Sequence, residues 1–376
     1  MLYIHNIQPG DKTKRDFHFI FYFTVKNKFV KKVIKQVLGI DVAQKELVVC
    51  LARMHDDWVP DLYATRSFKN TADGFKAMIE FVQKLVEPTI AVRYVMEATG
   101  VYHESLAYYL RDQDLEVSIV VPNKISNYVR TLEVKTVTDK TASQAIAQFG
   151  LERNLDKWEK PIPIYKKMKQ LTRERDQIMT ERTMTKNQLH AENAEAEPHK
   201  SSIERIKKRI DLLNKQEQEI NVELAALIGK DAVVKDFMKL LCSITGIGVL
   251  TAATVLAETN GFELIRNKSQ LTSYAGLDIK EKQSGTSVKG KPRISKKGNR
   301  FLRKAMHMPA LTAIRHDQRF KAIFVRLVSK HGIKMKAVVA VQRKLLEMMY
   351  TIYKTKKAYD KEYLKKEETA KIKEAA

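Results

Sequence analysis

The sequence has few cysteines and no long apolar run. Its only two cysteines, Cys50 and Cys242, lie in apolar surroundings. This scarcity excludes a disulfide framework and a zinc site built on cysteine pairs, and it fits a reducing, cytoplasmic environment. No apolar run approaches the roughly 20 residues that cross a membrane. Acidic residues are in the minority, with 44 Asp and Glu against 68 Lys and Arg, and the formal net charge is +24. Such a charge favours a polyanionic partner, nucleic acid before an anionic membrane surface.

The length of the chain predicts more than one domain. With 376 residues, two or three domains are expected. Residues 1–32 differ from the rest because an aromatic-rich run over 17–23 is flanked by lysines. A secretory signal is one alternative, but the apolar core is short and no small-residue cleavage site follows. We expect residues 1–32 to be a non-native or disordered extension, and the Lys- and Glu-rich residues 354–376 to be a frayed helix or a disordered tail.

Residues 33–160 have the pattern of an α/β domain. Two β-prone apolar runs flank a polar turn at Gln44 and Lys45, which predicts a hairpin over 35–51. The elements expected after it are a strand over 61–68, a helix over 71–85 with Thr71 as N-cap, a strand over 90–97, a helix over 103–111, a strand over 116–121 stopped by Pro122, and a helix over 138–149 ended by Gly150. The resulting order, β-β-β-α-β-α-β-α, is that of RNase H-like nucleases.

Three carboxylates lie in or at the ends of these predicted strands and helices. Asp41 is inside the first strand, where a buried carboxylate is costly without a partner. Glu97 ends the fourth strand, and Asp139 lies at the start of the last helix. RNase H-like nucleases present their first metal ligand as an Asp in the first strand. The alternative for Asp41 is an ordinary strand-end residue that caps a turn.

Residues 161–230 predict two long, charged helices, 168–189 and 203–227, separated by a break at Pro198. Apolar residues of the second helix recur at intervals of three and four, as in a coiled-coil seam, with Glu217 as its one polar position. The seam consists of Ile203, Ile206, Ile210, Leu213, Ile220, Leu224 and Leu227. We therefore expect an antiparallel helical hairpin that acts as a spacer or an oligomerisation arm.

Residues 231–353 predict a mostly helical domain with features suited to phosphate. Within 237–258, an apolar helix, a Gly-Ile-Gly turn and a second apolar helix are typical of a helix-hairpin-helix element. Gly246 and Gly248 would let the backbone approach a phosphate, and the alternative is a plain turn between core helices. The next segment is basic, and its candidate nucleic-acid-binding residues are Lys289, Lys291, Arg293, Lys296, Lys297, Arg300 and Arg303.

The same basic segment carries a candidate nucleophile, Ser284, beside the flexible Gly285. Its sequence is too polar to be core, and the alternative is a turn residue without a role. No His or Asp triad accompanies Ser284, so acyl-transfer chemistry is poorly supported. Ser287 is the nearest competitor, and Ser295 is a weaker one because its position suits a helix N-cap.

Taken together, several segments resemble the DEDD-type insertion-sequence transposases, the bridge-RNA-guided serine recombinases of insertion-sequence family one-hundred-and-ten. The resemblance covers about residues 37–350. The segments that carry it are Gly39-Ile-Asp-Val42, Met96-Glu-Ala-Thr-Gly-Val-Tyr-His103, Lys135-Thr-Val-Thr-Asp-Lys-Thr141, Ala147-Gln-Phe-Gly150, Tyr274-Ala-Gly-Leu277, Gln283-Ser-Gly285 and Ile294-Ser-Lys-Lys-Gly-Asn299. Each is weak alone, and their order and intervals make the match.

The resemblance implies a RuvC-like domain over 33–160, a coiled-coil insert over 161–230 and a C-terminal transposase domain over 231–353. It implies that four acidic residues hold a divalent metal, Mg²⁺ or Mn²⁺, and that a serine attacks DNA to form a phosphoserine link. Carried over, the catalytic residues are Ser284, Asp41, Glu97 and Asp139, the last three as metal ligands. The fourth acidic position is Ala142 in this chain, and Ser143 beside it is a candidate to hold a metal-bound water.

The implied partners are donor and target DNA, a guide RNA, and further copies of the chain, as a dimer that becomes a tetramer. Two alternatives stay open. A metal-dependent RuvC-like junction nuclease would use the carboxylates and leave Ser284 idle. A catalytically inactive nucleic-acid-binding protein is suggested by Ala142. A covalent protein–DNA adduct distinguishes the recombinase from both.

Overall fold

The computed structural model describes residues 31–132, 136, 138–281, 283–284, 288–290 and 292–362. Almost all of the expected N-terminal extension lies outside these residues, as do Gly285, Ser287, Lys291 and residues 363–376 of the tail. The chain divides into two compact units, Met1–Lys160 and Pro161–Ala376. No helix among the described residues is long and apolar enough to cross a membrane.

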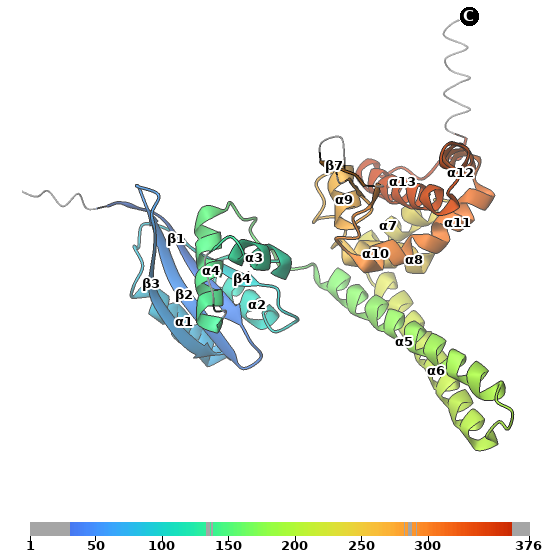
Figure 1. The fold of residues 1–376 in the computed structure, drawn as a ribbon, viewed down its shortest axis with the longest axis horizontal. Coiled ribbons are helices and arrows are strands. Elements are labelled where there is room, and N and C mark those ends of the chain that lie inside the picture. The colour runs from blue at the N-terminus through green and yellow to red at the C-terminus, as the bar shows by residue number, and fades with distance from the viewer. Residues whose placement is uncertain are drawn as a thin grey trace, which may run out of the picture. The chain divides into compact units, whose positions relative to one another are not determined.

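The first unit is built on a five-stranded mixed sheet of order β3-β2-β1-β4-β5 (Figure 1). β1 and β2 form the expected hairpin, β3 pairs antiparallel with β2, and β4 and β5 continue the sheet in parallel from β1. The strands are β1 (Val33–Val42), β2 (Glu46–His55), β3 (Pro60–Lys69), β4 (Val92–Glu97) and β5 (Glu116–Val120). This mixed α/β topology agrees with the RNase H-like order that the sequence predicts.

Helices cover both faces of this sheet. α1 (Ala72–Gln83) and α2 (Glu104–Asp112) pack on the face that carries Leu38 and Ile40. Since side chains alternate along a strand, Val37 points to the other face, where it meets α3 (Pro122–Val129) and α4 (Asp139–Glu152). The unit therefore has three layers, with the sheet in the middle.

One helix of this unit was not predicted, and one predicted helix end is wrong, each for a physical reason. Pro122 does stop the strand, but it also begins α3, because the missing N–H of proline costs nothing in the first helical turn. Gly150 does not end α4, which continues to Glu152. A Cβ on residue 150 would lie 2.8 Å from Val37 Cγ1, so this glycine lets the helix approach the sheet.

Where the structure describes it, the second unit consists of helices and two short β-ribbons, and its helices share one hydrophobic core. β6 (Ile279–Lys280) pairs with β9 (Arg293–Ile294), and β7 (Gln283–Ser284) pairs with β8 (Val288–Lys289). The helices are α5 (Pro163–Asn193), α6 (Lys200–Gly229), α7 (Ala232–Cys242), α8 (Val249–Glu258), α9 (Lys268–Tyr274), α10 (Arg300–Ala305), α11 (His307–His316), α12 (Gln318–His331) and α13 (Lys334–Thr355).

α5 and α6 lie along one another as two long helices (Figure 1). Polar contacts pair late residues of α5 with early residues of α6: Arg209 donates to Gln188 at 2.7 Å, and Arg182 donates to Asn214 at 2.9 Å. The helices are therefore antiparallel. The polar seam residue Glu217 accepts hydrogen bonds from Arg175, at 2.5 Å, and from Arg182.

Gly39 allows α4 to pack closely on β1. A Cβ at residue 39 would lie 2.3 Å from the backbone nitrogen of Ala147 and 2.4 Å from the carbonyl oxygen of Ser143. Because these are backbone atoms of α4, the conflict cannot be relieved by a change of rotamer. α4 consequently crosses β1 directly over Gly39, and the next residue of β1 on this face is Asp41.

Replacing this glycine should therefore separate the helix from the strand. We expect Gly39→Ala to lower the free energy of unfolding of the first unit by about 3 kcal/mol, as overpacking of a tight core does. Gly229→Ala is the control, since an added Cβ there meets nothing within 4 Å at the end of α6. Chemical denaturation of both variants tests this, and equal stability of Gly39→Ala and the wild type would contradict it.

Candidate active site

Two of the three predicted carboxylates come from adjacent parallel strands. Ile40 of β1 is in register with Met96 of β4, so Asp41 and Glu97 follow at neighbouring positions. By strand alternation both point to the sheet face covered by α4. The structure thus brings the first two candidate ligands to one edge of one sheet face.

The third carboxylate begins α4. Asp139 is the first residue of this helix, and Thr138 caps it by accepting the backbone N–H of Thr141 while the Thr141 hydroxyl accepts the N–H of Thr138. A carboxylate in the first turn is favoured by the positive end of the helix dipole. Because α4 contacts Gly39 through Ser143, one turn further on, Asp139 is carried toward Asp41.

The electrostatics of Asp41 show that the three groups act on one another. Burial is the largest cause that raises the pKa of Asp41 to about 6, and the negative charges of Asp139 and Glu97 raise it further. A hydrogen bond to the backbone of Val42 opposes this shift. Both neighbouring charges that act on Asp41 are negative, so a bound cation would relieve the repulsion.

The donor set suits a hard divalent cation. Mg²⁺ prefers carboxylate oxygens and keeps several waters, and Mn²⁺ accepts similar ligands. Among the described residues, no three His, Cys, Asp or Glu side chains are grouped closely enough to hold one ion together. The Glu97 carboxylate accepts a hydrogen bond from Thr99 Oγ1 at 3.3 Å. A coordination sphere shared by Asp41, Glu97 and Asp139 therefore stays a prediction.

The position of the fourth acid is not filled by a neighbour. Ala142 is half-buried in the first turns of α4. Ser143 is fully buried, and its Oγ donates to the carbonyl oxygen of Lys140 at 2.8 Å. Its backbone carbonyl lies against Gly39. Ser143 is thus part of the helix packing and does not take the place of the missing carboxylate.

Asn70, which the sequence analysis missed, joins the loops that follow the two strand carboxylates. Its Nδ2 donates to the carbonyl oxygen of Ala43, at 2.9 Å, and to that of Tyr102, at 3.2 Å. Its backbone N–H donates to the carbonyl oxygen of Lys45 at 2.9 Å. Ala43 lies just beyond Asp41, and Tyr102 lies in the loop that follows Glu97. A single Asn after a strand predicts only a turn, so the sequence carries no sign of this role.

In the second unit, Ser284 lies on a short β-ribbon. Its backbone pairs with Val288, and Gln283 pairs with Lys289. The neighbouring competitor Ser287 is outside the described residues. The suggested N-cap role of Ser295 is wrong: Ser295 Oγ donates to Asp278 Oδ1 at 2.5 Å, and Asn299 caps α10 instead. Ser295 is therefore held by a local contact at the base of the segment.

The two glycines between α7 and α8 differ in their surroundings. Gly246 has a φ of +93°, and a Cβ there would lie 2.6 Å from the carbonyl oxygen of Pro309 in α11. Its lack of a side chain is therefore explained by the turn and by packing. Gly248 is the N-cap of α8 and faces open space. A role of either glycine in phosphate binding stays a prediction.

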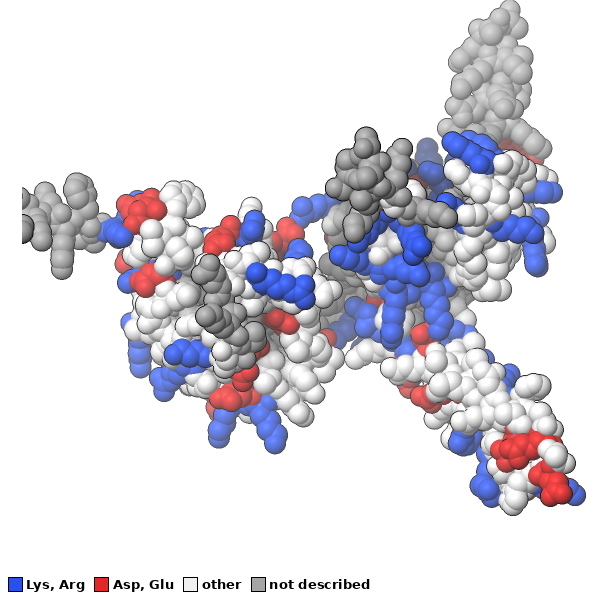
Figure 2. All heavy atoms as spheres, viewed as in Figure 1, with Lys and Arg blue, Asp and Glu red and all other residues white. Residues whose placement is uncertain are grey.

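The candidate cations are also not equivalent. Arg293, Lys296, Lys297 and Arg300 are exposed, and Figure 2 shows Lys and Arg gathered on this side of the second unit. Arg303 is half-buried and donates through Nη1 to the carbonyl oxygens of Ala275, at 2.8 Å, and Gly298, at 3.3 Å. Arg303 is thus committed to the backbone. Lys289 has only its backbone described, and Lys291 lies outside the described residues.

Comparisons with known proteins cover both units. A model of the "Transposase IS116/IS110/IS902 family" matches residues 238–324, and a DEDD-type IS110 model described as "Transposase" matches residues 38–192. The pilin gene-inverting proteins of Moraxella bovis and Moraxella lacunata are each 26% identical over 87% of this chain and 98% of their own length. The transposase for insertion sequence element IS1111A of Coxiella burnetii is 21% identical over 91% of this chain and 95% of its own.

Among solved structures, T. thermophilus RuvC in complex with a Holliday junction substrate is similar to part of the chain. The match has 9% sequence identity and a TM-score of 0.26, and it covers 33% of this chain and 99% of that one.

The raised pKa of Asp41 predicts a pH dependence of stability. A carboxyl with a raised folded-state pKa favours folding below its ordinary value of 3.8, and this contribution is lost as the pH rises through about 6. Without divalent metal, Asp41→Asn should therefore be more stable than the wild type at pH 7.5 and should lack this loss. Millimolar Mg²⁺ should stabilise the wild type more than the variant.

Thermal denaturation with EDTA or Mg²⁺, at pH 4 and pH 7.5, measures both effects. Asp73→Asn is a matched control, because Asp73 lies exposed in the first turn of α1. Mg²⁺ should change the melting temperature of this variant by the same amount as that of the wild type. An Asp41→Asn protein less stable than the wild type at pH 7.5 in EDTA would contradict the prediction.

Proposed function

The chain belongs to the IS116/IS110/IS902 family of transposases, and on this premise we propose that it cuts and rejoins DNA strands through a covalent phosphoserine intermediate. In this proposal Ser284 is the nucleophile, and Asp41, Glu97 and Asp139 hold Mg²⁺ or Mn²⁺. The observation that supports it most is that Asp41 and Glu97 follow at neighbouring positions of two adjacent strands. Burial, together with the charges of Asp139 and Glu97, raises the pKa of Asp41 there to about 6.

The proposed chemistry is a transfer of phosphate between oxygens. Ser284 Oγ attacks phosphorus, the phosphoserine bond forms as the bond to the departing strand's oxygen breaks, and the serine proton passes through water to that leaving oxygen. A metal held by the carboxylates would polarise the phosphate and stabilise the leaving oxygen. The exposed Arg293, Lys296 and Lys297 would offset phosphate charge near the nucleophile. Because the phosphoserine keeps the bond energy, strands can be exchanged and rejoined without ATP.

The proposal requires Ser284 and the carboxylates to meet, although they belong to different units. We propose that they meet between protomers, with the helical hairpin of α5 and α6 as the contact that assembles a dimer and then a tetramer on two duplexes. This role suits two long helices whose exposed faces are rich in charge.

Ala142 favours a second candidate function. With only three of the four family acids, this copy could bind nucleic acid without cutting it. A metal-dependent junction nuclease is the remaining alternative, and it would cut without forming an adduct. The three candidates therefore differ in two measurements, cleavage and adduct formation.

Removing the proposed nucleophile tests the leading function. Ser284→Ala should eliminate the covalent protein–DNA species on denaturing gels, while the free energy of unfolding changes by no more than about 0.5 kcal/mol, as expected for a hydroxyl in a polar segment. Ser287→Ala is the matched variant and should keep the adduct. Persistence of the adduct in Ser284→Ala and its loss in Ser287→Ala would show that the neighbouring serine is the nucleophile.

A guide RNA is proposed as the source of target choice, because the formal charge is +24 and the sequence has no recognisable DNA-reading motif. Recombination by the purified protein should therefore stop when its RNA is digested and resume when the RNA is restored. Recombination on DNA alone, in the presence of RNase, would refute this.

A further inference from the structure

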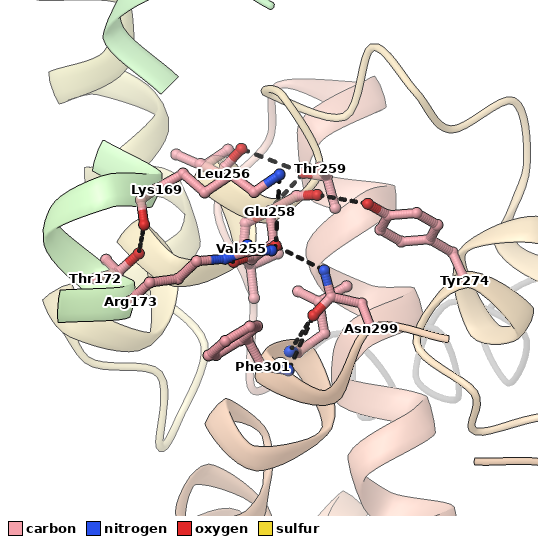
Figure 3. A network of polar contacts seen from close by, with 11 residues as sticks. Lys169, Thr172, Arg173, Val255, Leu256, Glu258, Thr259, Tyr274, Asn299 and Phe301 are labelled. Atoms are coloured by element: carbon pink, nitrogen blue, oxygen red, sulfur yellow. Dashed lines mark hydrogen bonds and ion pairs between the residues drawn. The ribbon is translucent and has the colours of Figure 1, made fainter. Parts of the chain in front are cut away.

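The second unit contains a buried carboxylate that the proposed chemistry does not use. Glu258, the last residue of α8, has a side chain with no exposed surface. Arg173 of α5 donates through Nε to Oε1 at 2.7 Å and through Nη2 to Oε2 at 2.9 Å, and Asn299 Nδ2 donates to Oε2 at 2.6 Å (Figure 3). Lys169 Nζ lies 3.9 Å from Oε2. A carboxylate in such a place is stable only with this degree of pairing.

Asn299 connects this carboxylate to the two ends of the segment 275–298, which carries Ser284. The Asn299 side-chain oxygen accepts the N–H groups of Phe301 and Leu302 and so begins α10. Its backbone N–H donates to the carbonyl oxygen of Tyr274 at 2.7 Å, and the Tyr274 hydroxyl donates to the carbonyl oxygen of Glu258 at 3.0 Å. Tyr274 and Asn299 flank residues 275–298, and Ser284 lies between them in the sequence.

The backbone is tightly packed where the two ends of this segment meet. Gly298 has a φ of +147°, and a Cβ there would lie 2.4 Å from the carbonyl oxygen of Tyr274. On the other side of the carboxylate, the Arg173 guanidinium lies over the ring of Phe301, 4.5 Å from its centre. Glu258 therefore joins three parts of this unit: the long helix α5, the end of α8, and both ends of the segment with Ser284.

We infer that Glu258 is a positioning residue, which through Arg173 and Asn299 holds the Ser284-bearing segment in register with α5. This inference rests on the proposed function, since it assigns the ion pair a role in presenting the nucleophile. A buried ion pair is a poor device for stability alone, because apolar residues of similar volume often serve as well. Its use here is explained by what it connects: residues 85 and 41 positions away from Glu258 in the sequence.

The ion pair of Glu217 in the α5–α6 hairpin provides the comparison. Glu217 is also in an ion pair, in its case with two arginines, Arg175 and Arg182. All three residues lie in the hairpin, and none reaches the Ser284-bearing segment. If ion pairs on α5 serve only stability, loss of either carboxylate should have similar consequences. If Glu258 positions the segment, only its loss should alter that segment.

The test uses the full chain and three variants: Glu258→Gln, Glu217→Gln as the control, and Arg173→Met combined with Glu258→Gln. Hydrogen exchange is followed in peptides that cover 272–281 and 292–303, and in peptides of α6. Adduct formation is measured as a first-order rate at saturating DNA with Mg²⁺, and DNA affinity is measured separately. The double variant removes both charges, so no guanidinium is left without its carboxylate. The amide oxygen introduced by Glu258→Gln can still accept a hydrogen bond from Asn299. We therefore expect the double variant to keep the fold even if the single variant does not.

For Glu258→Gln we expect exchange in the two segment peptides to rise about tenfold, with α6 unchanged. The adduct rate should fall about tenfold or more, as small misplacements of reacting groups cause, while DNA affinity stays near that of the wild type. The double variant should melt near the wild-type temperature yet keep both defects. Glu217→Gln should leave exchange in the two segment peptides unchanged.

Wild-type exchange and adduct rates in the double variant would overturn the inference, since the pair would then be only structural. The same holds if exchange rises while the adduct rate is unchanged. If the wild type itself forms no adduct, the proposed function fails, and the exchange difference between Glu258→Gln and Glu217→Gln still decides whether Glu258 holds the segment.

Discussion

The first unit depends on how closely one helix can approach one strand. α4 crosses β1 at a residue without a side chain, and its backbone occupies the space that a Cβ of Gly39 would need. Gly150 allows a second close approach further along the same helix. Because the helix is fixed at these points, the charge of its first residue, Asp139, adds to the burial that raises the pKa of Asp41. Packing of small residues thus sets the charge distribution at the sheet edge.

The two units treat buried carboxylates in opposite ways. Burial raises the pKa of Asp41 to about 6, and the negative charges of Asp139 and Glu97 add to this effect. Glu258 is more deeply buried but accepts hydrogen bonds from Arg173 and Asn299, so its charge is matched by a bidentate partner. The unmatched charge is suited to bind a cation that arrives from outside. The matched charge is suited to hold elements of the chain together.

Much of the fold follows from local sequence signals, but the supporting contacts do not. Hydrophobic alternation predicted the β1–β2 hairpin, and capping chemistry predicted Thr71 as the N-cap of α1. The helix after Pro122 was missed because a proline that ends a strand and one that begins a helix look alike. Asn70 and Glu258 were missed because their partners are distant in sequence, and single polar residues carry no periodic pattern. Register and capping are local properties, whereas these contacts exist only once the elements have packed.

The antiparallel arrangement of α5 and α6 determines how the length of this hairpin can change. α5 has 31 residues, and at 1.5 Å per residue it is about 46 Å long. Arg175 and Arg182 of α5 form ion pairs with Glu217 of α6, and these pairs fix the alignment of the two helices. Beyond these ion pairs, toward the turn at Pro198, the two helices of the hairpin pack on one another. Insertions or deletions of equal numbers of turns in both helices there would change the length of the hairpin while the ion pairs of Glu217 stay aligned. In the proposed assembly, the length of the hairpin would then set where two protomers meet.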